Sequence, residues 1–375
     1  MNYIEQRLGA PAGSRVRIVP DRILLTDGPG HAAAEAMLEQ GKAPAEALRS
    51  RITVILDHDI PAGSFASAFI QKHLIDFARE NGLAFLQSAG IAYELLKVRK
   101  DDIVVSCGEH GTILGAQGAL WFRLSEAEMQ ALLEQGETEL TVPETVNVRV
   151  EGRLPEGAER YDAALWMASQ AARDGKAMAL SDCTERGLTQ DDRKVLCLLL
   201  SRAGAATAYF AEDAGEPAET FDLSSVQPVT VNPGSILDVV PLAETEVPVN
   251  ACFIGGCAGG RIEELRLAAS ILKGRRIRRE LRLLIGFVDN ETYLQAVHEG
   301  LVDIFFDCGA QVTNPGCASC QTTSIGVVGD GEVLASTGCY NYIGCSGTEK
   351  SRIRIASAGS VARAALTGVL TGKEA

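Results

Sequence analysis

The sequence predicts an α/β protein built from three consecutive α/β units. Short β-branched runs alternate with longer segments of helical periodicity along the chain, which is typical of layered α/β structure. Aromatic residues make up only 5% of the chain, while Gly (38 residues) and Ala are abundant, a composition that suits tightly packed layers. With 375 residues, the chain is long enough for two or three domains with substantial cores.

We assign residues 1–143 to the first unit. Ile52 to Leu56 and Ile103 to Val105 are short, apolar and β-branched, so we predict them as buried strands. Ala66 to Glu80 carries the periodicity of a helix. The unit ends near Val142-Pro-Glu-Thr-Val146, where a polar helix gives way to an alternating strand.

The second unit is predicted over residues 144–246. It begins with the alternating strand from Val146 to Val150. Helical periodicity predicts two helices, from Tyr161 to Arg173 and from Asp191 to Ala203. A polar linker from Glu244 to Pro248 separates this unit from the next.

The third unit is predicted over residues 247–375. Three apolar runs are predicted as its strands: Phe253-Ile254, Leu281 to Phe287, and Ile304 to Phe306. A helix is predicted from Glu263 to Leu272, after a glycine-rich turn.

Charge and the chain start limit the possible partners and locations. The net charge of −14 argues against a nucleic acid or an anionic membrane as partner, because binding phosphates needs an excess of basic residues. The single basic run, Lys273 to Arg279, is short and is predicted as a solvated face. The N-terminus has no signal-peptide pattern, and no apolar stretch approaches 18 residues. We therefore expect a cytoplasmic protein whose ten cysteines are thiols or metal ligands.

Three cysteines are the candidate metal ligands: Cys257, and the CxxC pair Cys317 and Cys320. Each lies among small residues on a loop predicted to follow a strand, which is where α/β proteins place ligands. Three thiolates are one short of a closed site, so a cluster held by them keeps one position open for Lewis-acid chemistry. The alternatives are a zinc ion, a redox-active CxxC, and plain buried cysteines. The redox alternative is disfavoured by the turn sequence Asn314-Pro-Gly before Cys317.

Carboxylates and imidazoles follow two predicted strands of the first unit. Asp57-His58 comes directly after one strand, and His110 lies just past another, next to Glu109. A carboxylate beside an imidazole can hold its tautomer and raise its basicity. The alternative for each histidine is a loop residue without chemistry. Asp27, which follows Ile23-Leu-Leu25, opens a tight turn that by itself says little.

With these motifs in order, the chain resembles the aconitase and 3-isopropylmalate dehydratase superfamily, specifically the large subunit of the two-chain isopropylmalate dehydratase branch. The resemblance covers nearly the whole chain, and the ordered set is specific although no single piece is. The matching segments are Leu25-Thr-Asp-Gly28, Leu56-Asp-His58, the Glu109-His110 region, Leu120-Trp-Phe122, Glu151 to Gly157, Gly187 to Arg193, Phe253 to Leu272, Cys317 to Cys320, and Ile355-Ala-Ser357.

The resemblance implies a fold, a cofactor and a reaction. It implies a large subunit of three α/β, three-layer units around a cleft that carries a [4Fe–4S] cluster, with Cys257, Cys317 and Cys320 as ligands. Asp57, His58 and His110 would be catalytic, and Glu109 is a further acid or base candidate beside them. The activity implied is that of a hydro-lyase acting on a hydroxy acid. A separate small subunit would supply a mobile fourth domain that completes the site with a serine.

The chain departs from the family pattern around this site. Gly108-Glu-His-Gly111 replaces the family's Asp-Ser-His-Thr, and Cys257-Ala-Gly-Gly260 replaces Cys-Thr-Asn-Gly. Roughly twenty residues of a glycine-rich segment are missing between Gln117-Gly-Ala and Leu120. An Asn and a Glu of the family fall on Leu198 and Arg202.

The loop that should clamp substrate carboxylates is the largest departure. The family's Asn-Arg-Asn-Phe-x-Gly-Arg becomes Cys339-Tyr-Asn-Tyr-Ile-Gly-Cys345, so both arginines are lost. Since paired arginine–carboxylate contacts are strong and specific, we expect a substrate other than isopropylmalate or citrate. The candidate substrate-binding residues are Asp27, Arg202, Tyr340, Asn341 and Cys345.

Cys339 leaves a second class of function open. As a fourth thiolate it would close the cluster, and the protein would be a non-catalytic or redox protein on the same fold. As a small residue filling space, it leaves the dehydratase interpretation intact. We favour the dehydratase, because Asp57, His58 and His110 are present to serve a reaction.

Overall fold

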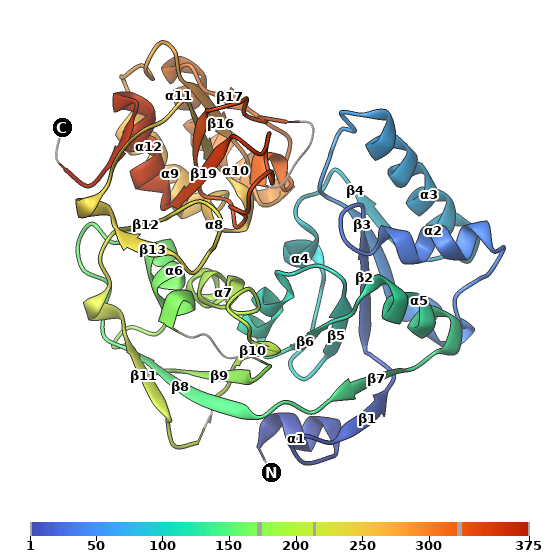
Figure 1. Ribbon diagram of the computed structural model, residues 1–375. Helices are drawn as coiled ribbons and strands as arrows, with labels where there is room; N and C mark the ends of the chain where they lie inside the picture. The colour runs from blue at the N-terminus through green and yellow to red at the C-terminus, as the bar shows by residue number, and fades with distance from the viewer. Residues whose placement is uncertain (1, 171–174, 213–214, 321–324, 374–375) are drawn as a thin grey trace.

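Three β-sheets, each covered by helices, form the framework of the molecule, as the ribbon diagram of the computed structural model shows (Figure 1). The structure describes residues 2–170, 175–212, 215–320 and 325–373. The predicted α/β class is confirmed, since most strands pair in parallel with helices between them. Among the described residues, no helix is both long and apolar enough to cross a lipid bilayer.

The first sheet is five-stranded and parallel, in the order β4-β3-β2-β5-β6. The chain leaves β2 for β3 on one side and later returns to place β5 on the other, so the strand order reverses beside β2. A small antiparallel pair, β1 and β7, lies below it (Figure 1). The elements are α1 (Tyr3–Leu8), β1 (Arg15–Ile18), β2 (Arg22–Thr26), α2 (His31–Glu39), β3 (Ile52–Leu56), α3 (Phe65–Asn81), β4 (Ala84–Gln87), α4 (Ala92–Leu95), β5 (Ile103–Ser106), the 3₁₀-helix η2 (Gly111–Gln117), β6 (Leu120–Arg123), α5 (Glu126–Gln135) and β7 (Thr138–Thr141).

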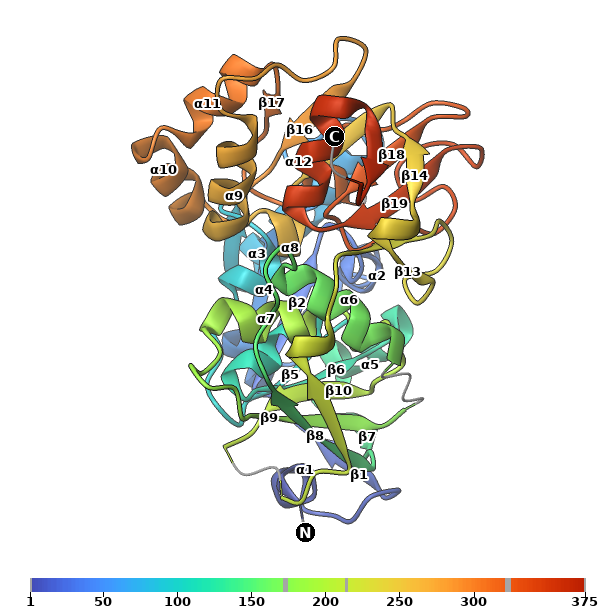
Figure 2. The same cartoon turned by 90° about the vertical axis from the view of Figure 1, so that its left-hand side faces the viewer.

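The second sheet is four-stranded and parallel, in the order β10-β9-β8-β11. Seen from the side, it lies below the third sheet, with α6 and α7 between the two (Figure 2). Its elements are β8 (Thr145–Glu151), α6 (Arg160–Gln170), β9 (Ala177–Asp182), α7 (Gln190–Leu198), β10 (Thr207–Phe210) and β11 (Glu219–Asp222). The helix expected from Asp191 to Ala203 ends at Leu198, and residues 171–173 of the other predicted helix lie outside the described part.

The third sheet has seven strands in the order β13-β12-β19-β18-β15-β16-β17. Its strand order reverses beside β15, with β16 on one side and β18 on the other. Strands β12 and β13 belong to this sheet although they precede residue 247. The elements are β12 (Val229–Val231), β13 (Val239–Pro241), β14 (Glu246–Pro248), β15 (Ala251–Ile254), α8 (Gly256–Gly259), α9 (Ile262–Leu272), β16 (Arg282–Ile285), α10 (Asn290–His298), α11 (Leu301–Cys308), β17 (Gln311–Val312), the 3₁₀-helix η5 (Ala318–Cys320), β18 (Val333–Ser336), β19 (Arg352–Ala356), α12 (Ala358–Thr367) and β20 (Val369–Thr371).

One predicted strand of the third unit is wrong: Ile304 to Phe306 lies inside helix α11. The buried positions of this helix are Leu301, Val302, Phe305 and Cys308, which follow the 3.6-residue period of a helix. Phe306, between them, is 58% exposed. Three adjacent apolar residues resemble a strand, and only the longer period around them distinguishes a helix.

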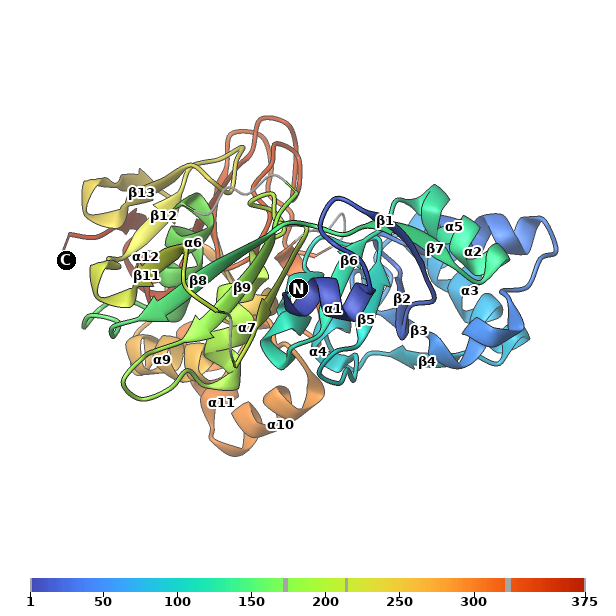
Figure 3. The same ribbon diagram turned by 90° about the horizontal axis from the view of Figure 1, so that it is seen from below.

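The three units meet at a buried ion-pair network. Arg261, at the start of α9, pairs with Glu94 of α4 and with Asp191 of α7, and Lys194 of α7 pairs with the same Glu94. The side chains of Arg261 and Glu94 are each only 2% exposed. Seen from below, the first unit lies on one side and the other two on the other side (Figure 3). One contiguous apolar core also draws residues from all three units, including Ile91, Leu198 and Phe253.

Candidate active site

A single cavity lies where the carboxyl ends of the first and third sheets face each other. Loops after β2, β3 and β5 supply one wall, and loops after β15, β17 and β18 supply the other. Such strand ends, beside a reversal of strand order, are where open α/β sheets bind ligands. The lining residues are Thr26, Pro29, Asp57, His58, Ile91, Tyr93, Gly108, Glu109, His110, Gly256, Cys257, Cys317, Cys320 and Tyr340. The cavity therefore brings together the three cysteines, the Asp57-His58 pair, Glu109 and His110.

The CxxC loop is attached directly to the catalytic loop predicted for the first unit. The backbone N–H of Cys317 donates to the carbonyl of Asp57 at 2.9 Å, and the Cys317 thiol lies 3.6 Å from Asp57 Oδ2. Gly316 allows this approach, because a Cβ there would lie 2.9 Å from the Asp57 carbonyl oxygen at a φ of +147°. The glycine of Asn314-Pro-Gly thus fixes how closely the two units approach.

The donor set at this cavity fits an iron–sulfur cluster. Cys257, Cys317 and Cys320 line the cavity from two adjacent loops, and all ten cysteines of the chain are free thiols. Burial raises the pKa of the Cys257 and Cys317 thiols well above the ordinary value. Buried thiols become thiolates readily only when a cation stabilises them, and a bound metal deprotonates its thiol ligands outright. Three soft donors around one cavity are therefore suited to hold such a group.

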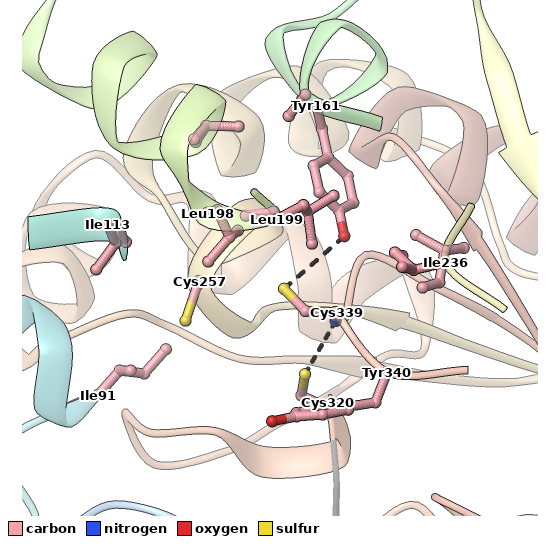
Figure 4. Packing of buried hydrophobic residues seen from close by; sticks show 14 of the residues in the cluster. Ile91, Ile113, Tyr161, Leu198, Leu199, Ile236, Cys257, Cys320, Cys339 and Tyr340 are labelled. Atoms are coloured by element: carbon pink, nitrogen blue, oxygen red, sulfur yellow. Dashed lines mark hydrogen bonds between the residues drawn. The ribbon is translucent and has the colours of Figure 1, made fainter. Parts of the chain in front are cut away.

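Cys339 does not line the described part of the cavity. Its side chain is fully buried and directed toward the Tyr161 hydroxyl, whose oxygen lies 3.8 Å from the sulfur (Figure 4). Its backbone N–H donates to Cys320 Sγ at 3.1 Å, and hydrogen bonding from Cys339 lowers the pKa of Cys320 to about 7. Cys339 therefore contacts the candidate ligand Cys320 without lining the described part of the cavity itself.

Asp57 and Asp27 hold His58 in place. His58 Nδ1 lies 2.6 Å from Asp57 Oδ1, and the second Asp57 oxygen accepts from the backbone of Ala92 at 2.8 Å. Asp27 Oδ1 accepts from the backbone N–H groups of Asp57 and His58, at 2.8 and 3.0 Å. The imidazole lies flat against Gly28, where any side chain would overlap the ring. Asp27 therefore fixes the conformation of the loop, because its carboxylate accepts the backbone hydrogen bonds of Asp57 and His58.

The two histidines of the cavity have opposite electrostatic surroundings. Burial opposes the protonation of His58, but the charge of Asp57 and the hydrogen bonds that the imidazole donates to Asp27 and Asp57 outweigh it and hold the His58 pKa well above its ordinary value. Burial, reinforced by the charges of Arg202 and His58, lowers the pKa of His110 to about 3. Near neutral pH, His58 is thus an imidazolium and His110 a neutral imidazole. Titratable neighbours whose pKa values are pushed apart are typical of acid–base sites.

Glu109, Arg202 and Tyr340 form an array along one edge of the cavity. Glu109 pairs with Arg202 at 3.0 Å and with Arg123 at 2.9 Å, so both carboxylate oxygens are engaged. The Arg202 guanidinium lies 4.4 Å from the centroid of the Tyr340 ring, and the His110 ring lies 4.8 Å from it. Arg202 reaches this place from the turn after α7, in the second unit.

The remaining predicted substrate residues are less accessible. Asn341 is 1% exposed, and its Nδ2 donates to the carbonyls of Asn232 and Ser235 at 2.7 and 3.0 Å. Cys345 is 4% exposed. Neither residue lines the described part of the cavity. Asn341 instead fastens the loop after β18 to the loop between β12 and β13.

Some residues around the site carried no signal in the sequence. Tyr93 lines the cavity, and its hydroxyl lies 2.8 Å from Ser106 Oγ. Tyr161 donates to the Gly338 carbonyl at 2.8 Å and so links α6 to the Cys339 loop. Neither tyrosine belongs to a recognisable motif. Each reaches the site only because α4 and α6 pack against segments that are distant in the sequence.

Asp57, His58 and Cys317 form a smaller group of possible metal ligands. Ligand atoms of Asp57, His58 and Cys317 all lie within 4.8 Å of one another, a spacing that a single metal ion can bridge. In the structure the carboxylate and the imidazole are instead hydrogen-bonded to each other.

Comparisons with known proteins show the family to which the chain is related. The family model for the aconitase family (aconitate hydratase) matches residues 237–368. The chain is 30% identical over 380 residues to the 3-isopropylmalate dehydratase large subunit of Pyrococcus horikoshii, covering 99% of this chain and 98% of the relative. It is 29% identical over 356 residues to 3-isopropylmalate dehydratase large subunit 1 of Methanopyrus kandleri, covering 86% and 85%. Among solved structures, holo-form aconitase X of Thermococcus kodakaraensis superimposes with a TM-score of 0.53 at 12% identity, covering 86% of this chain and 84% of that one, a likeness of fold.

Proposed function

We infer that this chain, which belongs to the aconitase family, is a hydro-lyase that removes water from a hydroxy acid, or adds water to the corresponding unsaturated acid. The observation that carries the proposal is the single cavity in which three cysteine thiols face an aspartate–histidine pair. Relatives that match the chain over nearly its full length are named dehydratase large subunits, which supports the same reaction class.

We propose that Cys257, Cys317 and Cys320 hold a [4Fe–4S] cluster. When bound, such a cluster supplies a Lewis acid for the hydroxyl group that leaves. The chain's own residues then have separate tasks. Asp57 fixes the tautomer and orientation of His58, and the His58 imidazolium is placed to donate a proton to the departing hydroxyl.

His110 and Glu109 have supporting roles in this proposal. His110 is neutral and buried, and its Nε2 has no hydrogen-bond partner among the described residues, so it can bind a polar group of the substrate. Glu109 lines the same cavity but is paired with two arginines. We therefore assign it the role of counter-ion to Arg202 in place of the acid–base role.

A partner subunit is part of the proposal. Because the matched relatives are named large subunits, we propose that a small subunit completes this cavity and supplies the group that removes the carbon-bound proton. We further propose three units, between which the cavity is formed. The first ends near residue 143, and the third extends back before residue 246 to include β12 and β13, which pair in its sheet. The substrate differs from isopropylmalate and citrate, since Tyr340 and Cys345 stand where the family pattern has arginines.

The activity is tested with protein purified anaerobically together with its small subunit. Hydroxy acids are supplied in turn, and the appearance of an α,β-unsaturated acid is followed by ultraviolet absorbance. We expect turnover of at least one hydroxy acid, and its loss in His58→Ala at unchanged iron content. Turnover that is equal in wild type and His58→Ala would contradict the assigned chemistry.

The alternative of a closed four-cysteine cluster is favoured by one observation, the hydrogen bond between Cys339 and Cys320. The orientation of Cys339 toward Tyr161 supports the open cluster instead (Figure 4). A redox protein of this kind would hold its cluster stably, show no response to hydroxy acids, and convert no substrate.

A further inference from the structure

The wall of the cavity lacks the cation that a carboxylate substrate requires. None of the described residues that line it is a lysine or an arginine. Its charged groups are the Asp57 and Glu109 carboxylates and the His58 imidazolium, which Asp57 already pairs. A hydroxy acid carries at least one carboxylate, and charge-assisted hydrogen bonds from a guanidinium are the usual way to bind it. Within this chain, such a cation has to come from directly behind the lining.

Arg202 is placed to fill this role. Its guanidinium lies 4.4 Å from the centroid of the Tyr340 ring and 3.0 Å from Glu109, and both of these residues line the cavity. The side chain is 13% exposed, and its Nε is buried without a hydrogen-bond partner among the described residues. Such buried donors are nearly always satisfied, so this Nε is available to an acceptor that a ligand would bring. His110 Nε2, against the same tyrosine ring, is also buried and has no hydrogen-bond partner in the part of the chain that the structure describes.

Arg123 provides an internal comparison. It pairs with the other oxygen of Glu109 at 2.9 Å, but its side chain is 56% exposed. It makes no stacking contact with Tyr340 that the structure records, whereas Arg202 does. Of the two arginines on Glu109, only Arg202 is desolvated, and desolvation is what makes a charge pair strong.

We propose that Arg202 binds the substrate carboxylate, and that the substrate has one carboxylate and an uncharged, apolar remainder. This inference rests on the proposed function and specifies its substrate class. Glu109 occupies one edge of the guanidinium, which leaves the edge bearing Nε for a single carboxylate. Pro29, Ile91, Tyr93 and Tyr340 offer an apolar wall for the remainder. A second carboxylate would face Asp57 and Glu109 without a cation of its own, which costs binding energy.

Two acids that differ by one carboxylate test this proposal. In 2-hydroxy-4-methylpentanoate, a hydrogen replaces the second carboxylate of 3-isopropylmalate. Their affinities for the cluster-containing protein, purified together with its small subunit, are measured anaerobically by titration calorimetry, with the shift of the reduced cluster's EPR signal as a second readout. We expect the monocarboxylate to bind at least tenfold more tightly. Tighter binding of 3-isopropylmalate, or no binding of either acid at millimolar concentration, would overturn the proposal.

Two substitutions separate ligand binding from a structural role of the ion pair. Arg202→Met should weaken monocarboxylate binding roughly 10- to 100-fold, the usual size for a charge-assisted contact, and Arg202→Lys should restore part of it. Glu109→Gln should tighten binding, because it frees the guanidinium and removes a negative charge. If the pair were only structural, both substitutions would act in the same direction, and that result would contradict the proposal.

Arg123→Met is the matched control, and we expect its affinity to stay within twofold of wild type. Iron and sulfide content is measured on every preparation. Loss of the cluster from wild type would contradict the proposed function, whereas a full cluster with equal affinities in wild type and Arg202→Met contradicts this inference alone.

Discussion

At the scale of single residues, the histidines of the cavity show how one site can hold an acid and a neutral imidazole side by side. Asp57 and Asp27 surround His58, and their charges exceed the cost of burying an imidazolium. His110 has no carboxylate contact that the structure records and lies near Arg202, so burial dominates. The difference depends on neighbours that come from separate loops. The sequence predicted both histidines but not this difference.

Titration of the histidines tests these assignments. In protein prepared without metal and labelled at histidine nitrogens, we expect NMR to show His58 doubly protonated well above pH 6.5, the ordinary histidine pKa, and His110 neutral down to about pH 4, since its pKa is about 3. Asp57→Asn removes the charge that stabilises the imidazolium, so it should lower the His58 pKa. An unchanged His58 titration in Asp57→Asn would show that another group controls it.

The role of Cys339 is tested by a single substitution. If Cys339 is not a ligand, Cys339→Ala keeps the backbone N–H that donates to Cys320 Sγ at 3.1 Å and leaves iron and sulfide content intact. Cys257→Ser, in contrast, should abolish cluster incorporation, because it removes a ligand. Content is measured after anaerobic reconstitution of both variants in parallel. If Cys339→Ala makes the cluster labile, Cys339 is a ligand.

At the scale of elements, the helices and strands that sequence periodicity predicted are present, apart from the strand at Ile304 to Phe306, because each buries one face or both. Strand β3 (Ile52–Leu56) matches its prediction, and α9 (Ile262–Leu272) begins one residue before its predicted start. A strand was wrongly predicted inside α11, because Ile304 to Phe306 are three adjacent apolar residues and the helical period becomes visible only over a longer window. The pairings of Glu109 with Arg202 and of Glu94 with Arg261 had no local pattern at all, because their partners are far apart along the chain.

Arg261, at the start of α9, links this helix to α4 and α7 through ion pairs. Arg261 pairs with Glu94 and Asp191 and donates from Nε to the Cys257 carbonyl at 2.9 Å. Arg261→Met would leave the buried Glu94 carboxylate with Lys194 as its remaining partner. We therefore expect a loss of about 1.5–3 kcal/mol in the free energy of unfolding, measured by urea denaturation. A matched control on the same helix is Arg266→Met, whose pairs with Glu263 and Glu299 are solvent-exposed. The control should cost less than about 1 kcal/mol.

Similar losses in Arg261→Met and Arg266→Met would contradict the assignment of Arg261 as the link between units. Glu94→Gln in the Arg261→Met background gives a second check. It removes the charge of a buried carboxylate that then has only Lys194 as its recorded partner, so it should recover part of the lost stability.

At the scale of the whole molecule, the function depends on two sheets that present their carboxyl ends to one cavity. The first sheet supplies Asp57, His58 and His110, and the third supplies the cysteines. The second unit supplies no residue that lines the described part of the cavity, but it places Arg202 behind Tyr340 and Tyr161 behind Cys339. The sequence could predict the cysteines and the Asp57-His58 pair from local motifs. The second unit's contribution could not be predicted, since it depends on how the units pack.

The measurement that tests the central claim most directly is iron and sulfide analysis with EPR on anaerobically prepared wild-type protein. The account predicts about four iron and four sulfide per chain, and the loss of one iron on mild oxidation, with the signal of a three-iron cluster. It also predicts that a hydroxy acid shifts the signal of the reduced four-iron form, because an open iron accepts its hydroxyl. A four-iron cluster that resists oxidation and ignores hydroxy acids, or a single metal ion without sulfide, would contradict it.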